Sequence, residues 1–72
     1  PLASGSATLA EAAALVAAVV PGHVTVAELD SVYGMPPHYD IDVRLQHGGL
    51  AQLRIDPATR QIAWRDPAVI AD

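Results

Sequence analysis

The 72-residue sequence has no cysteine, no phenylalanine and no lysine, and its aromatic residues are one tryptophan and two tyrosines. Without cysteine, no disulfide compensates for the modest core that a chain of this length buries. That core must be built from valine, leucine, isoleucine and alanine. The lack of cysteine does not distinguish a secreted domain from a cytosolic one, because both classes include domains without disulfides.

Positive charge is also scarce, since four basic residues stand against eight acidic ones and the formal net charge is -4. An acidic surface repels phosphate backbones, which disfavours nucleic-acid binding. The longest apolar stretch, ATLAEAAALVAAVV, contains Glu11 and stops at Pro21, so it is too short for a membrane span of about 20 residues. No charged segment followed by an apolar one marks a signal peptide. We therefore expect membrane attachment only through segments absent from this sequence.

The pattern of the first third predicts one helix. Residues 1–6, PLASGS, lack periodicity and are expected to form a disordered leader. Thr8 and Glu11 have the S/T-x-x-E spacing of a capping box, which places the helix start at Thr8. Pro21-Gly22 is expected to end the helix. Between these limits, apolar residues recur at helical spacing, namely Leu9, Ala12, Ala13, Val16, Val19 and Val20.

The remaining sequence predicts an antiparallel sheet of three to four strands. Residues 24–29 are rich in β-branched side chains, but their alternation slips near Ala27, which indicates a bulge or irregular pairing. After the connection GMPPH, residues 39–46 alternate strictly between apolar and polar side chains. The inward set is Tyr39, Ile41, Val43 and Leu45, and the outward set is Asp40, Asp42, Arg44 and Gln46.

The expected fold class is therefore α+β, with one N-terminal helix packed on one face of the antiparallel sheet. A single domain is expected over residues 7–66, followed by a frayed tail at residues 67–72.

The first hairpin turn contains Gly48-Gly49. A two-residue loop there would set each apolar row against a polar one, so a three-residue loop at residues 47–49 is predicted. This register pairs Ile41 with Ile55 and sets Asp42 opposite Arg54 on the outer face. The other register that has an odd number of loop residues is disfavoured, because it places like charges opposite one another.

The second turn, DPATR, predicts a four-residue loop at residues 57–60 that pairs Ile55 with Ile62 and Leu53 with Trp64. Asp56 is expected to accept hydrogen bonds from turn amides. Arg60 is expected to adopt the left-handed backbone conformation that glycine usually takes. Trp64 is expected to fill the core beneath the helix.

Taken in order, these elements resemble the PepSY domain family. The matching segments are an alanine-rich helix ending in VVPGHV, the strands VAEL and YDIDVRL, a glycine turn, and AQLRIDPATRQIAW. The last of these is similar to the family's ending of strand, D-x-x-T-G and strand. The resemblance extends from Thr8 to about Arg65, and Arg60 stands where the family usually has glycine.

The resemblance implies a bacterial extracytoplasmic module, periplasmic or secreted, of the kind found in peptidase propeptides, in membrane-anchored proteins and as stand-alone chains. It implies a non-enzymatic role as a peptidase inhibitor or other protein-binding module, with a peptidase or another envelope protein as partner. The alternative is the soluble sensor or scaffold domain of a membrane-anchored PepSY-containing protein.

No catalytic residue, cofactor or metal site is predicted from the residues themselves. His23, His38 and His47 fall at a helix exit, a loop and a hairpin tip, where solvent exposure is expected rather than metal binding. Asp40 and Asp42 offer paired carboxylates for acid–base chemistry. A strand face of alternating charges is, however, typical of a solvated surface.

A protein-binding site is predicted on the free edge of the sheet. The strand at residues 24–29 is expected to lie beside the strand at residues 39–45, which leaves its other edge open to an added strand. The predicted contact residues are Val24, Val26 and Glu28 on this edge and Asp40, Asp42, Arg44 and Arg54 on the adjoining outer face. The helix alanines Ala10, Ala14, Ala17 and Ala18 either form a second docking face or are simply good helix formers.

Overall fold

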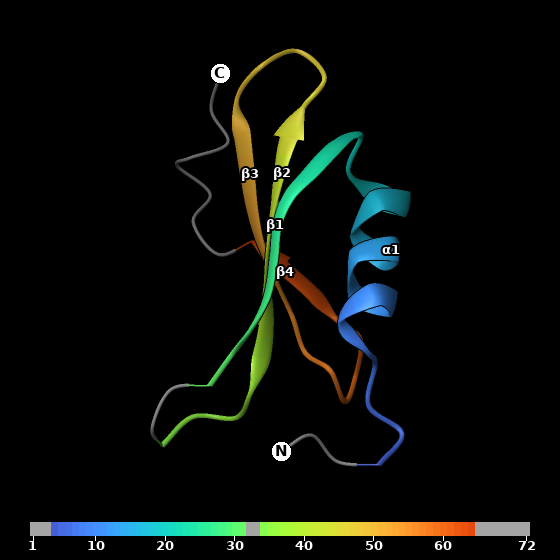
Figure 1. Ribbon diagram of the computed structural model, residues 1–72, viewed down its shortest axis with the longest axis vertical. Coiled ribbons are helices and arrows are strands. Elements are labelled where there is room, and N and C mark those ends of the chain that lie inside the picture. The colour runs from blue at the N-terminus through green and yellow to red at the C-terminus, as the bar shows by residue number, and fades with distance from the viewer. Residues whose placement is uncertain (1–3, 32–33, 65–72) are drawn as a thin grey trace.

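A computed structural model describes residues 4–31 and 34–64, and it confirms the α+β fold class. One helix, α1 (Leu9–Val19), precedes four strands: β1 (Gly22–Asp30), β2 (His38–Leu45), β3 (Leu50–Ile55) and β4 (Ile62–Trp64). The strands form one antiparallel sheet in the order β1-β2-β3-β4. The helix lies along one face of this sheet (Figure 1), chiefly over β1 and β2. Residues 67–72, predicted as a tail, and residues 1–3 of the predicted leader lie outside the described residues.

The start of α1 is fixed by the predicted capping box. The amide of Thr8 donates to the Glu11 carboxylate at 3.0 Å, and the amide of Glu11 donates to the Thr8 hydroxyl at 3.1 Å. The bond from the Thr8 amide is the main reason why the pKa of Glu11 lies below its usual value. At the other end, Val20 is already extended, and Pro21 prevents further helix.

The core lies between α1 and the helix-facing side of the sheet. Its buried residues are Ala12, Val16 and Val20 from the helical segment, Tyr39, Ile41 and Val43 from β2, and Ala51, Leu53 and Ile55 from β3. The predicted inward set of β2 is thus confirmed, since half-buried Leu45 also packs against this core. The predicted helix stripe is too wide, because Leu9 and Val19 are 36% and 63% exposed.

The register predicted for the first hairpin is wrong by two residues. Ile41 lies opposite Leu53, and Arg54 lies opposite Asp40 instead of Asp42. Leu45 and Gly49 close the loop, which leaves Gln46, His47 and Gly48 as its three residues, with Gly48 at φ 87°. A shift of two residues keeps every side chain on its predicted face, so apolar alternation could not detect it.

The second turn follows the prediction. The ladder pairs Leu53 with Trp64 and Ile55 with Ile62. Asp56 accepts hydrogen bonds from the amides of Ala58 and Thr59 at 2.8 and 3.2 Å. Arg60 has a φ of 64°, the left-handed conformation predicted for it.

The irregular pairing predicted in the first strand is present, two residues before the expected position. The β1–β2 register shifts between Val24 and Val26, so the irregularity lies at Thr25 instead of Ala27. The strand itself is longer than predicted and begins at Gly22. Its placement beside β2 is confirmed, so β1 is one edge of the sheet and β4 is the other.

The prediction that Trp64 fills the core is also wrong, because 47% of its surface is exposed. A helix about 10 Å wide covers roughly two strands spaced about 4.8 Å apart. Since α1 packs chiefly on β1 and β2, Trp64 at the end of β4 is left open to solvent, although Ile62 at the start of the strand still packs against the core. Trp64 therefore points to the helix-facing side of the sheet, as predicted, but its position on the edge strand leaves it exposed.

The segment before α1 is anchored to the sheet. The amide of Ala7 donates to the Pro57 carbonyl at 2.8 Å, and the Tyr39 hydroxyl donates to the Ala7 carbonyl at 2.7 Å. Ala7 is fully buried, and Arg60 donates to the Gly5 carbonyl at 3.3 Å. The turn between β3 and β4 therefore holds the beginning of the helix in place, a contact that the sequence did not predict.

Tyr39→Phe tests this anchor. The variant should lower the free energy of unfolding by about 1–2 kcal/mol, because it removes a buried hydrogen bond and leaves the Ala7 carbonyl without its donor. Urea denaturation measures the loss. Thr25→Val is the control, since it removes a hydroxyl that donates to the Asp42 carbonyl at an exposed position, where losses stay within about 0.5 kcal/mol. Equal losses in the two variants would contradict the anchoring role.

Candidate functional site

The β1 strand has an open edge and an apolar surface on both of its faces. Val24 and Leu29 lie on the helix-facing side and are 37% and 50% exposed, whereas Val26 lies on the outer side and is 42% exposed. Glu28 is also exposed on the outer side, opposite Asp40 of β2. Three exposed aliphatic side chains along one edge strand are suited to contact with another chain.

The ladder register shows which backbone amides of β1 face outward. The Leu45 amide bonds to Gly49, so the odd-numbered residues of β2 point their amides at β3 and the even-numbered ones point at β1. Val26 and Glu28 pair with even-numbered residues of β2 and therefore face inward. The amides of Ala27 and Leu29 are directed at the open edge, where an added strand could accept them.

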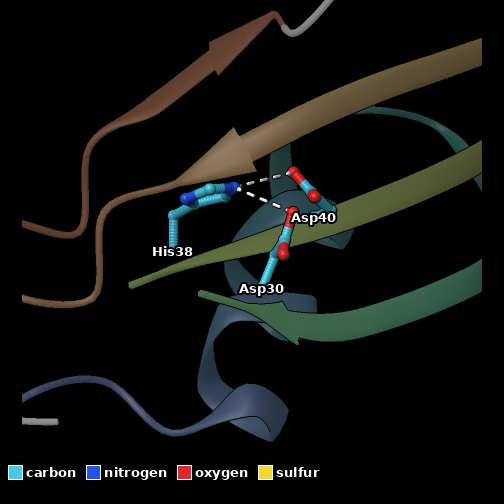
Figure 2. A group of neighbouring side chains, drawn as sticks. All are labelled: Asp30, His38 and Asp40. Carbon is cyan, nitrogen blue, oxygen red and sulfur yellow. Dashed lines mark ion pairs between the residues drawn. The ribbon is translucent and has the colours of Figure 1, made fainter. Parts of the chain in front are cut away.

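A polar cluster lies on the opposite side of the sheet from α1, where β1 ends and β2 begins. Asp30 pairs with His38 across the ladder, and Asp40 follows two residues later on the same face of β2. The His38 Nε2 atom is 3.5 Å from Asp30 Oδ2 and 3.6 Å from Asp40 Oδ1. Figure 2 shows both carboxylates directed at this one nitrogen.

Burial distinguishes this cluster from an ordinary charged surface. His38 is 6% exposed and Asp40 is 5% exposed, so the predictions of a solvent-exposed His38 and of a solvated outer face at Asp40 are wrong. The Arg54 Nε atom lies 3.6 Å from Asp40 Oδ1. Asp40 thus lies between the imidazole of His38, two residues earlier on β2, and the guanidinium group of Arg54, its cross-strand partner on β3.

A hollow of about 260 Å³ adjoins the cluster. Residues 35–38 line one side of it, and Arg54, Gln61 and Ala63 contribute to the other. A second, shallower hollow of about 300 Å³ includes Ala14 and Ala18 of the alanine face of α1.

The other predicted site residues are more dispersed. Arg44 is exposed on β2, and Asp42 and Arg54 are half-buried on the outer face. His23 and His47 are exposed, as predicted, and neither belongs to the group formed by Asp30, His38 and Asp40. Sequence reasoning missed Asp30 as a site residue. The available signal was the His-x-Asp spacing of His38 and Asp40, which places both side chains on one face of a strand.

Comparisons with known proteins give no match to any protein family, to any curated protein or to any solved structure. The resemblance to PepSY domains therefore depends on the order of the motifs alone. Within residues 4–31 and 34–64, no helix combines the length and apolar character needed to cross a membrane.

Proposed function

We propose that this chain is a non-enzymatic, PepSY-like module of the bacterial cell envelope that binds and restrains a peptidase or another envelope protein. The observation that carries the proposal is the open edge of β1, which combines outward-facing amides at Ala27 and Leu29 with exposed Val24 and Val26. Strand addition uses such an edge, with main-chain hydrogen bonds giving affinity and alternate side chains giving specificity.

Charged side chains next to this edge are placed to select among partners. Glu28 is exposed on β1 itself, and Arg44 is exposed on β2. Asp42 and Arg54 are half-buried on the same outer face. Asp40 is buried in the polar cluster, so its part in binding is to hold Arg54 and His38 in position.

Leu29→Pro tests the edge. Proline removes an amide that faces outward, and its ring obstructs an incoming strand, while the ladder to β2 keeps its own hydrogen bonds. We expect binding to the partner to weaken by at least about tenfold. The assay is inhibition of, and complex formation with, secreted metallopeptidases of the organism that encodes the chain.

Two variants make the result interpretable. Leu29→Ala removes the same side chain but keeps the amide, so it reports the contribution of the side chain alone. Glu28→Pro removes an amide directed at β2 and should unfold the strand, which circular dichroism would detect. Full binding by a folded Leu29→Pro variant would exclude the edge, and absence of any effect of the unmodified chain on these peptidases would exclude the inhibitory role.

A further inference from the structure

The cluster of Asp30, His38 and Asp40 has the arrangement of a metal site. One potential ligand atom from each side chain lies within 4.8 Å of the other two. The residues come from two paired strands, so the ladder between β1 and β2 fixes their separation. Sites built on strands hold their ligands more precisely than sites on loops.

The His38 ring is oriented as a metal ligand would be. Its Nδ1 atom lies 3.4 Å from the Pro36 carbonyl oxygen, which can only accept a hydrogen bond, so the proton of a neutral imidazole is on Nδ1. The lone pair is then on Nε2, which is buried and has no hydrogen-bond partner among the described residues. A second-shell hydrogen bond to one ring nitrogen is the usual way to direct the other at a metal.

This nitrogen faces two carboxylate oxygens (Figure 2), so three electron-rich atoms are brought within 4.8 Å of one another. Such a group requires a cation at its centre or a proton on the imidazole. The two carboxylates of Asp30 and Asp40 outnumber the single guanidinium group of Arg54 in this group. Glu28, opposite Asp40 in the ladder, adds further negative charge to this face.

The distances favour the metal. A charge-assisted N–H···O hydrogen bond measures about 2.7–2.9 Å, whereas the two contacts of His38 Nε2 measure 3.5 and 3.6 Å. Neighbouring ligand atoms of a tetrahedral zinc ion are about 3.3–3.4 Å apart, given metal–ligand bonds of about 2.0–2.1 Å. The two separations from His38 Nε2 are therefore within a few tenths of an ångström of those in a zinc site, and the two carboxylate oxygens lie within 4.8 Å of one another.

We infer that Asp30 Oδ2, His38 Nε2 and Asp40 Oδ1 bind a divalent transition-metal ion, with Zn²⁺ as the preferred ion. An imidazole together with carboxylates is a donor set that zinc accepts readily. Calcium and magnesium favour oxygen ligands alone, so the nitrogen of His38 selects against them. Three protein ligands leave the fourth tetrahedral position to water, on the side of the half-exposed Asp30.

Arg54 provides a further test of whether Asp40 is a metal ligand. Its Nε atom is 3.6 Å from the same Asp40 oxygen that would ligate the metal. The guanidinium group orients Asp40, but its positive charge also competes with a metal for that oxygen. Removal of this charge in Arg54→Gln should therefore strengthen metal binding several-fold, provided that Asp40 is a ligand.

The test is calorimetric titration of the full chain with zinc chloride at pH 7.5. We expect saturation at one ion per chain. Asp30→Asn is the main variant, because the side chain of Asp30 is 42% exposed and we expect its replacement to preserve the fold. Loss of a second-shell partner alone weakens metal binding by about 10–100-fold, so loss of this ligand should weaken it by about 100-fold or more.

Matched controls separate the site from the acidic surface. Asp42→Asn makes the same change of charge on the same face of the sheet, and His47→Ala removes an exposed imidazole at the hairpin tip. Both should bind zinc within about twofold of the unmodified chain. If either control weakens binding as much as Asp30→Asn, or if calcium competes equally with zinc, the assignment is overturned.

Nitrogen NMR of the His38 ring provides a readout that does not depend on affinity. Zinc should shift the Nε2 resonance and leave the proton on Nδ1. A doubly protonated ring that zinc does not perturb would identify the cluster as an ion pair only and would overturn the inference.

Discussion

Leu53→Ala is expected to lower the free energy of unfolding by about 2–5 kcal/mol, as is typical when a buried leucine is truncated and leaves a cavity. Leu53 is 1% exposed and lies in β3, at the centre of the core cluster. A domain of this size has a total stability of roughly 4–11 kcal/mol. The variant should therefore be partly or wholly unfolded, which urea denaturation followed by circular dichroism would show.

Leu29→Ala is the matched control for this prediction, because it makes the same chemical change at a position that is 50% exposed. It should cost about 1 kcal/mol or less, since little contact is lost and no closed cavity forms. Similar losses at the two positions would mean that the core is not located between α1 and β3. The same variant serves in the binding assay, so its stability must be known in any case.

Gly22→Ala is expected to destabilise the protein by more than about 3 kcal/mol. A Cβ atom at Gly22 would lie 2.2 Å from the Arg44 carbonyl oxygen and 2.9 Å from Val43 Cγ1. Because the first of these is a backbone atom of the adjacent strand, relief requires that β1 and β2 separate. The φ of 152° at Gly22 is a further reason why a side chain is unfavourable there.

Gly48→Ala provides the comparison for Gly22. Gly48 also has a positive φ, at 87°, but an added Cβ would meet no atom within 4 Å. The Gly48→Ala variant should therefore lose only about 1 kcal/mol of stability, which is the conformational cost of an alanine at a positive φ. Thermal unfolding of both variants measures the difference, and equal melting temperatures would show that close approach of β1 to β2 is unimportant.

Local chemistry was sufficient to predict much of the fold. The capping box at Thr8, the hydrogen bonds of Asp56 and the left-handed Arg60 each depend on residues within a few positions of one another. The inward face of β2 follows in the same way from strict alternation. In each case the physical cause is contained in a short segment of sequence.

Features that depend on partners distant in sequence could not be predicted in this way. The hairpin register differs from the predicted one by two residues, which leaves the alternation of side chains unchanged. The position of the helix decides that Trp64 is exposed, and no pattern within β4 encodes it. The contact of His38 with Asp30 depends on the cross-strand pairing of β1 with β2, which is not implied by a single histidine in a proline-rich loop.

The anchor between Ala7 and the second turn has a consequence for the order of folding. Each strand of the sheet pairs only with its neighbour in sequence, so the hairpins close short loops, which is rapid. The contact of Ala7 with Pro57 instead joins residues near the two ends of the described chain and closes a much longer loop. We therefore expect the sheet to assemble first and the helix to dock last, so that loss of the anchor accelerates unfolding more than it slows folding.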